Sequence, residues 1–148
     1  MNGKFLLDSN LLIYAYDRSE QTKQVKARNV LDWLQARRAG VLSTQVLGEF
    51  FAVATRKLAK PLTVQEAYVE LEGFLRSFQV ADVTRYIVLE AGRGSVRYQL
   101  PYWDAQLWAT AKLNQIATVL SEDFANGSRI EGVQFVNPFT SNAWQASA

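Results

Sequence analysis

Short apolar runs alternate with longer amphipathic stretches along this chain, and the alternation predicts strands separated by helices. The first run, residues 5–7, has the character of a strand buried on both faces, as in a parallel sheet. It stops at Asp8, and Ser9 and Asn10 favour the start of a short helix. Further strands are predicted at residues 41–42, 80–83, 118–121 and 133–136.

The intervening stretches have helical periodicity. Helices are expected over residues 21–39, from 43 to about 58, from 63 to about 78, from 84 to before Pro101, and over 103–113. Gly40 is expected to end the first of these, and Thr63 followed by Glu66 has the spacing of a capping box. Gly92 and Gly94 predict a bend in the helix that begins at residue 84.

Strands that alternate with helices form a parallel sheet covered on both faces. The pattern therefore predicts an α/β fold, a three-layer sandwich with a five-stranded parallel sheet flanked by helices. The length of 148 residues fits one domain, which we place at residues 1–140. The small and polar residues 141–148 are expected to fray.

Composition then restricts the chemistry. The chain contains neither cysteine nor histidine, which excludes disulfides, zinc fingers, thiol nucleophiles and any scheme that needs an imidazole. The formal net charge of +2 permits a polyanionic partner but does not require one. There is no signal-peptide pattern and no apolar run of membrane-spanning length, so we expect a cytoplasmic protein.

Four acids are the candidates for chemistry. Asp8 and Asp123 follow predicted strands, whereas Glu49 and Asp104 lie near the starts of predicted helices and share faces with apolar residues. All four can therefore face one edge of the sheet, outside the carboxyl ends of the strands, where ligands bind in such folds. Glu122, beside Asp123, is a rival for the fourth position.

Each acid also has a purely structural interpretation. Asp8 can act as a helix cap, and the acid at 123 can belong to a turn. Glu49 can pair with Arg56 or Lys57, and Asp104 can interact with its helix dipole. Taken together, however, four convergent carboxylates repel one another unless a cation lies between them. Oxygen ligands suit Mg²⁺ or Mn²⁺, and the matching chemistry is phosphodiester hydrolysis.

The motifs around these acids resemble those of the PIN-domain family of metal-dependent ribonucleases, which includes the VapC-type toxins of toxin–antitoxin pairs. The segments that carry the resemblance are LLDSNLLIY at residues 6–14, STQVLGEF at 43–50, YWDA at 102–105, LSEDF at 120–124 and VNPF at 136–139. The resemblance implies that Asp8, Glu49, Asp104 and Asp123 form the catalytic and metal-binding set, with Ser9 and Asn10 in support. Ser9 stands where many members have threonine. The resemblance also implies a cognate antitoxin and a homodimer.

An RNA substrate requires cations near the acidic site to hold phosphates. The candidates by proximity to the motifs are Arg18, Arg56, Lys57, Arg97 and Lys112. Trp103 and Trp108 are either platforms for unpaired bases or core residues. The helices within residues 21–58 are expected to leave apolar surface for a partner.

Two other functions are compatible with an Asp after the first strand. A phosphoryl-transfer or receiver-type domain also has this feature, but it requires additional acids or a late lysine that the sequence does not place suitably. The second is a PIN-fold module that binds RNA or protein without cleavage. A variant that loses metal binding but retains RNA or antitoxin binding would distinguish the metal site from the scaffold that carries it.

Overall fold

A computed structural model describes residues 3–124 and 126–147. The helices are as follows: α1 Ser9–Tyr14, α2 Gln21–Arg37, α3 Thr44–Ala54, α4 Val64–Ser77, α5 Arg85–Tyr98, α6 Tyr102–Leu113 and the 3-10 helix η1 Ala143–Ser147. The strands are as follows: β1 Phe5–Leu7, β2 Gly40–Ser43, β3 Gln79–Ala81, β4 Thr118–Leu120, β5 Arg129–Ile130 and β6 Val133–Val136.

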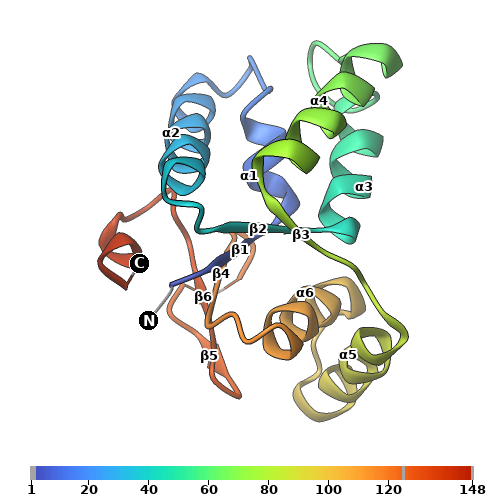
Figure 1. Cartoon of the computed structure of the whole chain (residues 1–148), viewed down its shortest axis with the longest axis vertical. Coiled ribbons are helices and arrows are strands. Elements are labelled where there is room, and N and C mark those ends of the chain that lie inside the picture. Colours follow the sequence, from blue (N-terminus) through green and yellow to red (C-terminus); the bar gives the residue numbers. More distant parts are fainter. Residues whose placement is uncertain (1–2, 125, 148) are drawn as a thin grey trace.

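The strands form one sheet in the order β3-β2-β1-β4-β6-β5. Helices α1 to α4 lie on one side of it, and α5 and α6 lie on the other (Figure 1). This arrangement confirms the α/β sandwich with a parallel sheet. Five strands are parallel, and the sheet has a sixth, because β5 pairs antiparallel with β6 at the edge. Strand β5 consists of only Arg129 and Ile130, which is too short for a periodic pattern, so the sequence did not reveal this strand.

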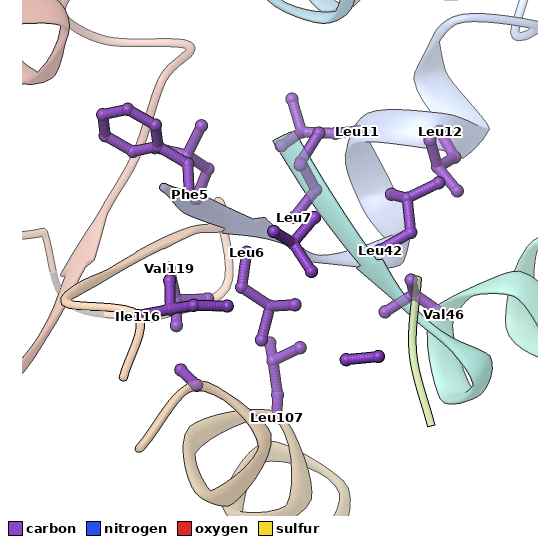
Figure 2. Close-up of a cluster of buried hydrophobic side chains, with 14 of the residues drawn as sticks. Phe5, Leu6, Leu7, Leu11, Leu12, Leu42, Val46, Leu107, Ile116 and Val119 are labelled. Carbon is purple, nitrogen blue, oxygen red and sulfur yellow. The ribbon is translucent and has the colours of Figure 1, made fainter. Parts of the chain in front are cut away.

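The central strand β1 is buried on both faces. It pairs with β2 on one side and β4 on the other, with Leu7 opposite Leu120. Figure 2 shows Leu6 directed toward Leu107 of α6, whereas Phe5 points to the opposite face of β1. Burial of apolar side chains in both helical layers therefore fixes the strand that ends at Asp8.

Local sequence explains the helix boundaries on the α1–α4 side. The capping box of Thr63 and Glu66 is present at the start of α4. Helix α2 ends at Arg37, and Arg38 adopts a left-handed conformation with φ of 52°. Gly40 instead belongs to β2, where an added Cβ would lie 2.9 Å from the ring of Phe78. Gly40 thus allows a close approach and does not end the helix.

Helix α5 continues without interruption through both of its glycines, where we predicted a bend. An added Cβ at Gly94 would lie 2.6 Å from the ring of Trp108 in α6, whereas one at Gly92 would meet nothing within 4 Å. Gly94 therefore allows α5 to pack closely against a large buried side chain. Close packing against Trp108 is a role for Gly94 that the sequence did not indicate.

The segment after residue 140 differs from the frayed tail that we expected. It contains η1, and Trp144 is buried with its ring 5.1 Å from Phe5 and 5.1 Å from Trp33. Residue 148 lies outside the described residues. In the described part of the chain, no helix has the length and apolar character needed to cross a membrane.

Candidate active site

The site is built around Asp8, which the β1–β4 ladder places beside Ser121. The Asp8 N–H donates to the Leu120 carbonyl at 2.9 Å, which extends the ladder by one residue beyond the strands. The Ser121 hydroxyl then donates to Asp8 Oδ2 at 2.7 Å, and the Ser9 N–H donates to Oδ1 at 2.7 Å. Asp8 is therefore both the cap of α1 and a fixed, buried carboxylate.

Burial raises the pKa of Asp8 from its ordinary value of 3.8 to about 6. The hydrogen bonds from Ser121 and Ser9 oppose this shift, and the nearby charges of Asp123 and Glu49 add to it. A buried carboxyl that is surrounded by like charges has an environment that favours a proton or a cation.

Glu49 and Asp104 approach the same region from the other elements. Glu49 lies on α3, and burial raises its pKa while the charges of Asp104 and Asp123 add to the shift. Asp104 is in the first turn of α6, and its pKa is raised by burial and by Asp123. Each of the three therefore has a raised pKa, and Asp123 contributes to every shift. In the described part of the chain, Glu49 has no ion pair with Arg56 or Lys57.

The loop after β4 distinguishes Asp123 from its neighbour. The Asp123 N–H donates to the Ser121 hydroxyl at 3.1 Å, and the Asn10 amide donates to Asp123 Oδ2 at 3.3 Å. Glu122 instead accepts from Tyr14 at 2.6 Å and pairs with Lys23 at 2.9 Å. The geometry therefore directs Asp123 toward the other acids and Glu122 away from them.

The carboxylate and amide oxygens of the site suit a hard divalent cation, although they do not form a complete cage of ligands around it. Asn10 Oδ1 and Glu49 Oε1 are buried without a hydrogen-bond partner among the described residues. Both are oxygen acceptors of the kind that Mg²⁺ and Mn²⁺ prefer. In residues 3–124 and 126–147, no group of three acids is close enough to hold a metal alone. Magnesium typically retains waters and is bound by one or two carboxylates together with substrate phosphates, so such a cage is not required.

The cations chosen by motif proximity are not equivalent. Lys112 is held by Glu90 and Glu131. The Arg97 Nε donates to the Tyr98 hydroxyl at 3.3 Å. The remaining candidates are all exposed: Arg18, Arg56 and Lys57.

The two tryptophans have different environments. Trp108 is fully buried and donates to the Ile130 carbonyl, so it is a core residue. Trp103 is 63% exposed and lies beside Asp104. Its exposure leaves the platform interpretation open for this residue alone.

Sequence reasoning missed Ser121 as a residue that positions the site. Ser121 follows β4 as Asp8 follows β1, so the register of two parallel strands was the signal that could have identified it. It also missed the amide side chains of Gln45 and Gln106, which are linked by a hydrogen bond of 3.0 Å. The spacing of polar residues on two separate helices gives no indication of such a link.

The fold and the site define an α/β domain with a cluster of interacting carboxylates at the carboxyl ends of its central strands. The PIN domain family model matches residues 5–125, and the chain belongs to this family. No curated protein sequence is similar to the chain at a significant level.

Solved structures with the same fold include a toxin–antitoxin complex from Klebsiella pneumoniae, with 19% identity and a TM-score of 0.64 over 91% of this chain and 98% of that one. A DNA-bound VapBC from Salmonella typhimurium has 21% identity and a TM-score of 0.63, over 91% and 98%. VapC20 from Mycobacterium tuberculosis, a sarcin-ricin loop cleaving toxin, has 18% identity and a TM-score of 0.56, over 78% and 87%. At these identities, the likeness establishes the fold.

Proposed function

We propose that this protein is a metal-dependent endoribonuclease that hydrolyses RNA phosphodiester bonds, and that it is the toxin of a toxin–antitoxin pair. The observation that supports this most is the coupling of Asp8, Glu49 and Asp104 through Asp123, with the pKa of each of the three raised. Membership of a family of metal-dependent ribonucleases agrees with it.

Asp8, Glu49, Asp104 and Asp123 are the residues that would hold Mg²⁺ or Mn²⁺. The chemistry supplied by the bound cation is a lowered pKa of water and positive charge against the developing charge of the phosphate. Because Asp8 takes up a proton near pH 6, proton and cation compete for the same carboxylate, and metal affinity should fall below this pH.

The chain's own residues keep the carboxylates in place for this reaction. Ser121 and the Ser9 N–H hold both oxygens of Asp8, so that its side chain cannot rotate without losing a hydrogen bond. Asn10 and Ser121 together orient Asp123. Such support keeps reacting groups in a productive geometry.

The partners follow from surfaces and from the solved neighbours. The Klebsiella and Salmonella proteins are toxin–antitoxin complexes, which supports an antitoxin partner here. We expected residues 21–58 to form a partner surface. Among the described residues of this segment, however, Val25 is the only large apolar residue that is exposed. Exposed apolar side chains gather instead on α4 and α5, where they suit the antitoxin and a homodimer: Val64, Tyr68, Val69, Leu75, Tyr86, Val88, Leu89 and Val96.

Cleavage of an RNA panel tests the proposal. Antitoxin-free protein is incubated with single-stranded and structured RNAs in Mg²⁺ or Mn²⁺, beside an EDTA control and the Asp8→Asn variant. Asp82→Asn is the matched control, because it makes the same change at an exposed carboxylate. We expect EDTA and Asp8→Asn to abolish cleavage and Asp82→Asn to preserve it. Folded, metal-loaded protein that cleaves no RNA would instead favour a PIN-fold binding module.

A further inference from the structure

A hollow of about 430 Å³ adjoins the acidic site, and it is lined by Glu49 itself. Its wall from α3 also contains Thr44, Gln45 and Gly48, and the wall from α6 contains Trp103 and Gln106. Val83 closes it, and its N–H donates to the Thr44 hydroxyl at 3.1 Å. This hydrogen bond holds the loop between β3 and α5 against α3, so the hollow is present without a ligand.

The chemistry of the lining combines an aromatic ring with amides. Trp103 packs edge-on against the ring of Tyr102 at 5.0 Å between centroids, and it remains 63% exposed, so its ring is accessible to a ligand. The Gln45 amide donates to the Trp103 carbonyl at 3.2 Å, and the Gln106 amide donates to Gln45 Oε1. The Tyr102 hydroxyl in turn donates to Gln106 Oε1 at 2.8 Å. This chain of hydrogen bonds orients both amides at the edge of the hollow.

We propose that this hollow binds one unpaired nucleobase of the RNA substrate, stacked on Trp103 and contacted at its edge by Gln45, which the buried Gln106 holds in place. This inference rests on the proposed ribonuclease function and deepens it. Aromatic stacking with hydrogen bonds from amides to base edges is how proteins read single-stranded RNA. The lining contains no Lys or Arg among the described residues, so a phosphate is not the expected occupant.

The position of the hollow fits a base whose phosphate is being cleaved. Trp103 precedes Asp104 in the first turn of α6, and Gly48 precedes Glu49 on α3. The hollow therefore has one of the four acids, Glu49, in its lining, and a second, Asp104, follows the lining residue Trp103 in sequence. A nucleotide with its phosphate at the carboxylates has its base within reach of this space, so the hollow would select which unpaired nucleotide is presented for cleavage.

Binding in the Asp8→Asn background tests the hollow apart from catalysis. The probes are fluorescein-labelled oligoribonucleotides of A, C, G and U, together with an abasic strand of equal length. Trp103→Ala should weaken binding of at least one base-bearing strand about tenfold, from the usual strength of base stacking, and leave the abasic strand unchanged. Trp103→Phe should restore most of the affinity, because its ring still stacks.

Gly48→Leu fills the hollow without removing any lining side chain, since an added Cβ at Gly48 meets nothing within 4 Å. Gly48→Leu should weaken binding of the same strand. Gly73→Leu, on α4 and equally unobstructed at Cβ, is the matched control and should leave binding unchanged. Circular dichroism of each variant confirms that it is folded. Equal loss for base-bearing and abasic strands, or no loss for either, overturns the proposal.

The two proposals fail in different ways. Base-dependent binding by folded protein that cleaves no RNA would contradict the nuclease and keep the base site. Cleavage that is indifferent to both Trp103→Ala and Gly48→Leu would contradict the base site and keep the nuclease.

Discussion

Replacement of Asp8 by asparagine should stabilise the protein at neutral pH while it abolishes cleavage. The pKa of Asp8 is raised from 3.8 to about 6, so the folded protein retains this proton to a higher pH than the unfolded chain does. The stability associated with the neutral carboxyl is fully present below pH 4 and is lost as the pH rises through about 6. Asparagine cannot ionise and does not incur that loss.

The size of the effect follows from two contributions. The shift in pKa corresponds to about 3 kcal/mol, gained by Asp8→Asn above about pH 7. Against it stands the hydrogen bond from Ser121 to Oδ2, whose loss costs about 1 kcal/mol at every pH. We therefore expect the variant to be about 2 kcal/mol more stable near pH 8 and about 1 kcal/mol less stable near pH 4.

Urea unfolding followed by circular dichroism at both pH values, with EDTA present, measures the difference. Asp82→Asn, at an exposed carboxylate, should change stability by less than about 0.5 kcal/mol at either pH. A difference between Asp8→Asn and wild type that does not reverse sign with pH would refute the reasoning. Added Mg²⁺ should narrow the gap near pH 8, because a cation that binds the folded wild type stabilises it.

Three further predictions concern the fourth acid and the packing of the fold. Asp123→Asn should reduce kcat/KM for RNA cleavage about 10- to 100-fold, whereas Glu122→Gln, whose carboxylate pairs outside the site, should change it less than about threefold; equal losses would contradict the assignment of Asp123. Trp144→Ala should lower the free energy of unfolding by about 3–5 kcal/mol, measured in urea, and a loss below about 1 kcal/mol would show that η1 adds little. Gly94→Ala should cost about 1–3 kcal/mol through overpacking against α6, and thermal unfolding beside the unobstructed Gly92→Ala tests it; equal effects would count against the close approach.

Much of the fold could be predicted because its signals are local. The buried strands and the capping box at Thr63 are determined by residues that are adjacent in sequence. The functions of Gly40 and Gly94 depend instead on Phe78 and Trp108, which come from other elements. A glycine that permits a close approach has the same local signature as one that bends or ends a helix.

The residues of the candidate site likewise divide into those that local sequence identifies and those that only the fold brings together. Asp8 and Asp104 were identifiable from their places at the end of a strand and the start of a helix. The choice between Glu122 and Asp123 was not, since it depends on where Tyr14, Lys23 and Asn10 lie after folding. The roles of Ser121 and of the Gln45–Gln106 pair likewise arise only when β1 meets β4 and when α3 meets α6.

The hydrogen bond between Asp8 and Ser121 spans 113 positions of the chain, and this separation affects synthesis. The first acid leaves the ribosome early, but its partner and Asp123 are among the last parts of the family-matched segment to be translated. Because such distant pairings form late in folding, a nascent chain carries no assembled acid cluster until β4 has emerged. Translation that stops before this point therefore yields a fragment that lacks the complete site.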